Sequence, residues 1–202
     1  MFIYLMFFMS SMNMNGNNND TNYRYTMPQF NITIVGKSSG ICTVVNNIYD
    51  ISKSINHPPE VIMKYIASVT GSNYIHERQS ITGTHTVDEL NDIIIEYIKY
   101  IVFCQRCFIP ETIPSLSGSK KNIQLQFCCS GCKNTTNIFN PNKRIKKGID
   151  IIIKYLKNEL EWKMQKGTVV SQNNDFDLLT DNQHIDIQDN YNDNELNPFD
   201  FI

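Results

Sequence analysis

The amino-acid sequence predicts an α+β fold, in which a small mixed α/β domain is followed by a four-cysteine ribbon, a basic helix and an acidic disordered tail. Three observations support this: a segment of alternating apolar residues, several segments with apolar residues at helical spacing, and two C-x2-C pairs. The chain has 202 residues, of which 41% are hydrophobic and 19% are charged. A chain of this size and composition can bury one modest core and a small satellite module.

The first strand is expected at residues 29–35, because QFNITIV alternates in the way that is typical of a half-buried strand. The following GKSSG is typical of a turn. From residue 43 to residue 56, apolar residues recur every three or four positions, which predicts a helix with one buried face. The residues on this face are Val44, Ile48, Ile51 and Ile55.

Two prolines then end this helix and begin another over residues 60–69, which is followed by an extended segment over 73–82. A third helix has a clear start, because Thr86 and Glu89 have the spacing of a capping box. A last, lysine-rich helix is predicted over residues 148–166 by its amphipathic pattern.

The two ends of the chain are expected to lie outside the folded part. Residues 1–22 include an Asn-rich stretch without periodicity and predict a flexible leader. The opening MFIYLMFFM lacks the basic region of a signal peptide and the length of a membrane span, so no membrane partner is expected. Residues 133–167 hold nine Lys or Arg and three acidic residues, whereas residues 171–202 hold eight acidic residues and no Lys or Arg. Separate basic and acidic partners are therefore plausible, and the acidic segment is predicted to be disordered.

Two C-x2-C pairs, Cys104 with Cys107 and Cys129 with Cys132, are separated by 21 residues and carry the strongest chemical signal. Each pair can present two thiolates from a tight turn, and two such turns complete the four-sulfur shell that zinc favours. The prediction is a zinc ribbon with a structural ion, because four cysteines leave no open position for catalysis. Disulfides and free core thiols are the alternatives, and Cys128 competes with Cys129 as a ligand.

Other candidate sites are weaker. Residues Gly36, Lys37, Ser38, Ser39 and Gly40 could contact a nucleotide, but a phosphate-binding loop needs a glycine where Asn31 stands. Cys42 is expected to be a small buried hydrophobe on its helix. The four histidines, His57, His76, His85 and His184, have no partners at catalytic or ligand spacing, so surface or turn roles are expected.

The order of these elements resembles the family of translation initiation factor 5 and the beta subunit of initiation factor 2. The markers are NHPP, GTHTVDEL, GKSSGICTVVNN and the two C-x2-C pairs, and the resemblance runs from about residue 23 to residue 137. It implies the following division of the chain: a leader over 1–22, an α+β domain of this family over 23–102, a zinc ribbon over 103–137, a basic amphipathic helix over 138–170 and an acidic tail over 171–202.

The stretch NYRYTMP is similar to the factor 5 branch, which carries an arginine between tyrosines just before Met-Pro. Arg24 is the only basic residue among the first 36. The resemblance implies that Arg24 acts as an arginine finger on a partner GTPase and that Lys64 assists, whereas Cys42 stands where the family has a lysine. The alternative is that Arg24 only stacks on Tyr23 or Tyr25. As a free arm before residue 29, it could project ~17 Å from the folded body.

The resemblance implies a translation initiation factor that is not itself an enzyme but stimulates GTP hydrolysis by initiation factor 2. The expected partners are GTP-bound initiation factor 2 with initiator tRNA and the small ribosomal subunit, with possible RNA contact through the basic helix. The expected location is the cytoplasm, or the host cytoplasm if the chain is viral. The chain looks like the N-terminal, GTPase-activating half of factor 5, since 202 residues leave no room for that factor's C-terminal helical-repeat domain.

Two other functions remain open from the residues. A structural beta-like subunit would co-purify with the other subunits of initiation factor 2 without stimulating GTP hydrolysis. An RNA-binding zinc-ribbon protein would use the lysine-rich helix and would show a steep salt dependence of RNA binding without any need for the GTPase.

Overall fold

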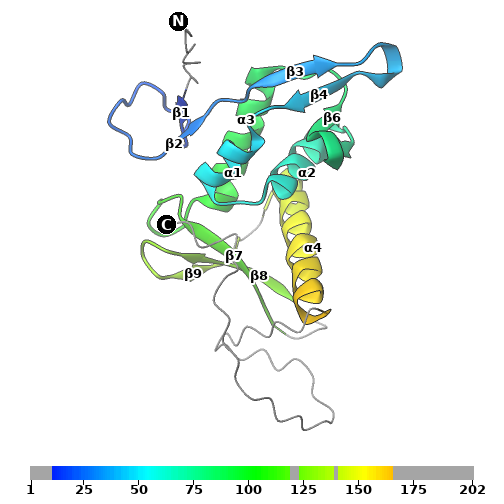
Figure 1. Ribbon diagram of the computed structural model, residues 1–202. Coiled ribbons are helices and arrows are strands. Elements are labelled where there is room, and N and C mark those ends of the chain that lie inside the picture. Colours follow the sequence, from blue (N-terminus) through cyan, green and yellow to red (C-terminus); the bar gives the residue numbers. More distant parts are fainter. Residues whose placement is uncertain (1–10, 119–122, 139–140, 166–202) are drawn as a thin grey trace, which may run out of the picture.

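The computed structural model describes residues 11–118, 123–138 and 141–165, which form four α-helices and three antiparallel sheets (Figure 1). The predicted α+β class is therefore confirmed. The predicted acidic tail, residues 171–202, and residues 1–10 lie outside the described residues. None of the helices in the described ranges is both long and apolar enough to cross a bilayer.

A short hairpin opens the described chain. Strand β1 (Ser11–Asn13) pairs with β2 (Thr26–Pro28), and the side chains of Met12 and Met14 are buried in the core. The structure therefore differs from the flexible leader expected up to residue 22. The Asn-rich composition conceals the burial of alternate methionines, which anchors this segment to the folded body.

The loop between β1 and β2 is held together by asparagine side chains. The Asn13 amide nitrogen donates to the carbonyl oxygens of Asn17 and Asp20, each at 2.7 Å. The Asn18 side chain accepts a hydrogen bond from the backbone N–H of Asn13 at 2.8 Å. Asparagine stabilises turns through such local bonds, so a polar run without periodicity can still form a defined loop.

The second sheet has the strand order β3-β4-β6-β5 and is antiparallel throughout. Its strands are β3 (Ile32–Val35), β4 (Cys42–Val45), β5 (Tyr74–Ile75) and β6 (Ser80–Thr82), with short 3-10 helices at Ser38–Gly40 and His76–Arg78. The helix predicted from residue 43 is wrong in its first part, because α1 (Ile48–Ile55) begins only after β4.

Three helices pack against this sheet and supply most of the core. They are α1, α2 (Pro59–Thr70) and α3 (Val87–Tyr97), and α3 continues as a π-helix over Ile98–Val102. The predicted apolar faces are confirmed, since their main residues are buried: Ile48, Ile51, Ile55, Val61, Ile62, Tyr65, Ile66, Leu90, Ile94, Tyr97 and Ile101.

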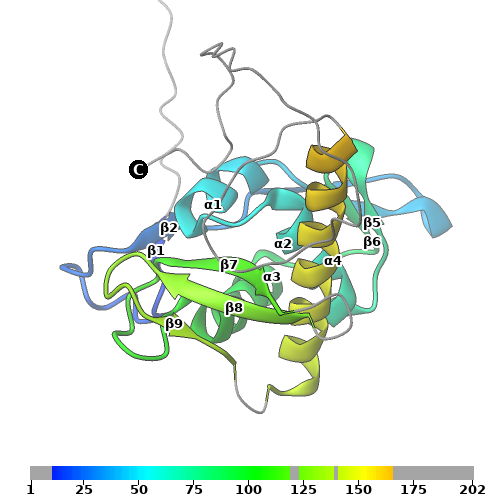
Figure 2. The ribbon, with the colours of Figure 1, turned by 90° about the horizontal axis from the view of Figure 1, so that it is seen from below.

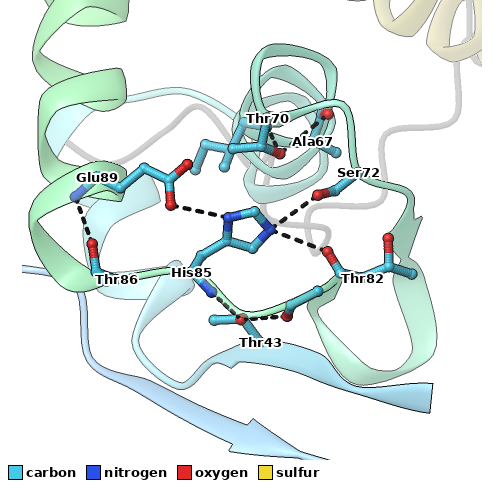
Figure 3. Close-up of polar contacts among 10 residues, drawn as sticks. Thr43, Ala67, Thr70, Ser72, Thr82, His85, Thr86 and Glu89 are labelled. Carbon is cyan, nitrogen blue, oxygen red and sulfur yellow. Dashed lines mark hydrogen bonds and ion pairs between the residues drawn. The ribbon is translucent and has the colours of Figure 1, made fainter. Parts of the chain in front are cut away.

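The TGTHTV segment fixes the start of α3 against three other elements (Figure 3). His85 Nδ1 lies 3.1 Å from a carboxylate oxygen of Glu89, and its Nε2 lies 3.0 Å from Ser72 Oγ and 3.1 Å from the Thr82 carbonyl oxygen. The backbone N–H of His85 donates to Thr43 Oγ1. His85 therefore ties the end of α2, strands β4 and β6, and α3 together, which agrees with the predicted turn role.

The capping box predicted at the start of α3 is formed in part. The backbone N–H of Glu89 donates to Thr86 Oγ1 at 3.2 Å, which satisfies one of the free amides at the helix start. The Glu89 carboxylate turns to His85 instead of closing the box.

The ribbon consists of β7 (Thr112–Ser117), β8 (Gln124–Cys129) and β9 (Thr135–Thr136). Thr112 joins it to the end of the preceding helix, because its buried hydroxyl lies 3.0 Å from the Ile101 carbonyl oxygen and 2.8 Å from that of Val102. The ribbon therefore continues the domain without a flexible linker.

Helix α4 (Lys143–Gln165) lies alongside α2 (Figure 2) and begins five residues before the predicted start. The Asn142 side chain caps it by accepting from the backbone N–H of Ile145 at 2.8 Å. Its buried residues Ile145 and Ile152 belong to the same core as Leu125 and Phe127 of β8. The domain, the ribbon and α4 thus share one hydrophobic core.

Candidate metal centre and arginine site

Four cysteine sulfurs from the two C-x2-C pairs meet at one end of the ribbon. Cys104 Sγ lies 3.7 Å from Cys132 Sγ, Cys107 Sγ lies 3.6 Å from Cys129 Sγ, and all four sulfurs lie within 4.8 Å of one another. A tetrahedral zinc ion with bonds of about 2.3 Å places its sulfur ligands about 3.8 Å apart. The donor set and its spacing therefore fit such an ion.

The two halves of the cluster have the same backbone geometry. In the first turn the N–H of Phe108 donates to the Cys104 carbonyl, and in the second the N–H of Lys133 donates to the Cys129 carbonyl. Phe108 and Lys133 adopt left-handed conformations, with φ of 56° and 59°. Each tight turn aims its two sulfurs inward, as the sequence spacing predicts.

The surroundings of the thiols differ across the cluster. Hydrogen bonds from Asn134 lower the pKa of Cys132 to about 6, whereas burial raises the pKa of Cys129 to about 12. A bound divalent cation favours the thiolate form of all its ligands, including a buried one.

The remaining two cysteines lie away from this cluster. Cys128 is exposed on β8, where the alternation of the strand turns it to the opposite face from Cys129. Cys42 is buried, as expected, but on strand β4 and not on a helix.

Arg24 lies in the loop that joins β1 and β2, two residues before β2 begins at Thr26. Its side chain is exposed, and its guanidinium carbon lies 5.5 Å from the centroid of the Tyr25 ring. Strand β2 packs on α1, so Arg24 is carried by the folded body and not by a free arm. Stacking and exposure coexist at this residue.

Tyr25 connects this loop to the ribbon. Its hydroxyl donates to Glu111 Oε1 at 2.8 Å, across 86 positions of sequence, and this bond raises the pKa of Tyr25. Figure 2 shows the β1–β2 hairpin beside the start of β7, which follows Glu111 directly. No spacing rule links residues so distant in sequence, so sequence reasoning missed this contact.

Lys64 lies on the exposed side of α2 and forms a salt bridge with Glu60, one helical turn away. Both residues line a groove between α2 and α4, together with Tyr155 and Glu159 of α4. Within the described residues no hydrogen bond or ion pair joins Lys64 to Arg24, so the structure does not bring the two predicted residues into direct contact.

The GKSSG segment forms the turn of the β3–β4 hairpin. Gly36 has a φ of 93°, and a Cβ at this position would lie 2.2 Å from the Gly40 carbonyl oxygen. A phosphate-binding loop runs from a strand into a helix, whereas this turn runs from a strand into an antiparallel strand. The hairpin thus favours an ordinary turn, and nucleotide contact by residues 36–40 gains no support.

His57 is buried, which differs from the surface role expected for it. Its Nδ1 lies 2.7 Å from the Tyr97 hydroxyl, and its Nε2 has no hydrogen-bond partner among the described residues. Burial lowers the pKa of His57 to about 4, so the ring is neutral at physiological pH.

A small α/β domain with a four-cysteine ribbon defines the class of protein to which this molecule belongs. The chain belongs to the family described as the domain found in initiation factors 2B and 5, whose family model matches residues 15–135. The resemblance predicted from the sequence is thereby confirmed.

Curated relatives include several proteins named as eukaryotic translation initiation factor 5. The chain is 32% identical over 128 residues to the probable factor of Schizosaccharomyces pombe, which covers 61% of this chain and 32% of the relative. It is 35% identical over 117 residues to the Caenorhabditis elegans factor, covering 56% of this chain and 26% of the relative. The matched part thus spans about a third or less of these relatives.

Proposed function

We propose that this protein acts in translation initiation and stimulates GTP hydrolysis by initiation factor 2 in the complex with the small ribosomal subunit. The observation that carries the proposal is the exposed Arg24, held at the surface of a domain whose family includes translation initiation factor 5. The protein is then not an enzyme itself, because it supplies a side chain to the active site of a partner GTPase. Such a role belongs in the cytoplasm, where initiation takes place.

Arg24 has the chemistry that this role requires. Its guanidinium is always charged and offers several planar donors, so it can stabilise the negative charge that develops on the γ-phosphoryl oxygens in the transition state. Because β2 holds the loop on α1, the domain itself must dock beside the GTPase site. Lys64, on a different element, would then contact another part of the partner.

The test is single-turnover GTP hydrolysis by initiation factor 2, loaded with GTP and initiator tRNA on the small subunit, with and without this protein. Arg24→Ala should reduce the stimulated rate by about 10^3-fold or more, since an arginine finger contributes about 10^3 to 10^5 in rate. Arg24→Lys should restore little, because an ammonium lacks the planar fork.

The matched control is Arg78→Ala, which removes another exposed arginine, on the short helix between β5 and β6. It should stimulate like the parent, and all variants should bind initiation factor 2 equally. An Arg24→Ala variant that stimulates as well as the parent would show that Arg24 is only a packing residue.

We also propose that the four-cysteine cluster binds one structural zinc ion. Cys104, Cys107, Cys129 and Cys132 provide a closed tetrahedral set of sulfur donors, which zinc prefers. The ion would hold the two turns of the ribbon together and would take no part in the hydrolysis.

RNA contact through α4 is a further part of the proposal. Six cations lie on its exposed positions: Lys143, Arg144, Lys146, Lys147, Lys154 and Lys157. Two of them already have protein partners, since Arg144 pairs with Glu96 and Lys147 donates to the Ser68 carbonyl. The remaining cations are available to the phosphates of ribosomal RNA, and the salt dependence of binding would reveal them.

A further inference from the structure

Arg24 and the ribbon are connected through a single side chain, Tyr25. The ring face of Tyr25 lies under the Arg24 guanidinium at 5.5 Å, and its hydroxyl donates to Glu111 Oε1 at 2.8 Å. One aromatic residue thus contacts the arginine with its face and the ribbon with its tip.

Glu111 is itself held on both sides. Its backbone carbonyl accepts from the N–H of Ser130 at 2.8 Å, inside the second cysteine turn. The next residue, Thr112, pairs with Cys129 and is fastened to the end of the π-helix through its hydroxyl. The carboxylate therefore projects from a fixed point of the ribbon.

The Arg24 side of the connection is less constrained. The loop between β1 and β2 is exposed, and its other bonds are local ones, such as the bond from the N–H of Met14 to the Tyr25 carbonyl at 3.0 Å. These local bonds shape the loop but do not relate it to the rest of the molecule. The Tyr25–Glu111 bond is what ties the loop to the ribbon.

We propose that Tyr25 and Glu111 are positioning residues that hold the Arg24 guanidinium in the orientation needed by the partner GTPase. This inference rests on the proposed function and goes beyond it by assigning a role to the ribbon. Neither residue contacts the GTPase chemistry directly. They act by reducing the number of conformations open to the arginine before docking, which lowers the entropic cost of forming the active arrangement.

Three variants test the bond. Tyr25→Phe keeps the ring under the guanidinium and removes the hydroxyl. Glu111→Ala removes the acceptor, and Glu111→Gln keeps a neutral one. The control is Tyr155→Phe, since the Tyr155 hydroxyl makes an equivalent bond to Glu159 Oε1 at 2.7 Å on α4, a separate element.

The kinetic readout separates positioning from binding. Tyr25→Phe and Glu111→Ala should each lower the maximal stimulated rate of GTP hydrolysis about tenfold and leave the half-saturating protein concentration unchanged. Glu111→Gln should restore much of the loss, and Tyr155→Phe should match the parent. In an Arg24→Ala background, Tyr25→Phe should have no further effect, because it acts only through the arginine.

The second readout needs no GTPase. Arg24 is the first site for trypsin along the chain, so the rate at which a fragment ending at Arg24 appears reports how freely the loop opens. Glu111→Ala leaves the residues on both sides of that bond unchanged and should increase the rate about tenfold.

Unchanged cleavage together with an unchanged maximal rate in Tyr25→Phe and Glu111→Ala would overturn the positioning role. If the parent protein fails to stimulate hydrolysis, the proposed function falls. Faster cleavage in Glu111→Ala would then still support the tie between loop and ribbon, and unchanged cleavage would overturn it.

Discussion

A neutral histidine lies at the centre of the core. His57 is 2% exposed and meets the Tyr97 hydroxyl, and the Tyr97 ring packs in turn on Tyr65 with their centroids 4.8 Å apart. Burial also raises the pKa of Tyr97, so this pair carries no charge at physiological pH. The NHPP stretch thus has a packing role here, in the turn between α1 and α2.

The burial of His57 predicts a pH-dependent stability. Its pKa is about 4 in the folded protein, against about 6.5 in an unfolded chain. Between these values the unfolded chain binds a proton that the folded protein does not, so the free energy of unfolding should decrease as the pH falls from about 6.5 towards about 4. Urea unfolding at pH 7.5 and pH 5.5 should show a loss of about 1.4 kcal/mol from this group.

The variant His57→Gln should lose this part of the pH dependence, although it should also be less stable at pH 7.5. His76→Gln, at an exposed position, is the control and should keep the dependence of the parent. Equal pH dependences for the parent and His57→Gln would contradict the prediction.

Among the secondary-structure elements, α4 depends on one glycine for its position. A Cβ on Gly148 would lie 3.0 Å from Ile101 Cδ1 and 3.1 Å from Tyr65 Cδ2. The absence of a side chain lets α4 approach α2 and the π-helix closely. Glycine weakens a helix by about 1 kcal/mol relative to alanine, so its presence here indicates a packing requirement.

Gly148→Ala should therefore destabilise the protein in spite of its better helix propensity. Overpacking costs about 1–3 kcal/mol, and after the gain in propensity the free energy of unfolding should fall by about 0.5–2 kcal/mol. Thermal or urea unfolding measures this change. Asp150→Ala, at an exposed position of the same helix, should be neutral or stabilising. A Gly148→Ala protein as stable as the parent would show that α4 can shift to admit a methyl group.

The elements could be predicted from the sequence where one periodicity dominates. Helices α2 and α3 were predicted well, because their apolar spacing and their start signals agree. The segment 42–47 was not, because Val44 fits the helical pattern of the residues that follow it while also lying in a strand. Pairing with β3 on one side and β6 on the other decides its conformation, and that pairing is a tertiary effect.

At the scale of the whole molecule, the core crosses the boundaries predicted between the domains. Leu125 and Phe127 of the ribbon and Ile145 of α4 lie in one cluster with the helices of the α/β domain. The sequence predicted the zinc ligands by spacing alone, since two C-x2-C pairs need only local turns. It could not predict the Tyr25–Glu111 bond, which depends on how distant segments fold together.

Metal removal should therefore affect the whole molecule. Structural zinc contributes on the order of 10–16 kcal/mol in small domains that fold around it, and the ribbon shares its core with the rest of the chain. The parent, purified under reducing conditions, should contain one zinc ion per chain, and a strong chelator should lower the Tm of the whole protein and not of the ribbon alone.

Ligand identity is tested by two neighbouring cysteines. Cys129→Ala should lose the ion, because Cys129 belongs to the sulfur cluster, whereas Cys128→Ala should retain it, because Cys128 lies exposed on β8. Metal analysis of both variants provides the comparison. Zinc retained by Cys129→Ala, or a parent protein without zinc, would contradict the assignment.

The bond between Tyr25 and Glu111 also sets an order of events during synthesis of the chain. The two residues are separated by 86 positions, and at about 5–20 residues per second the second one is added roughly 4–17 s after the first. The backbone that holds Glu111 is complete only when Ser130 has followed. A nascent chain therefore carries its arginine early but acquires the fastening for it late, so that only a protein synthesised through both cysteine turns presents Arg24 in its final orientation.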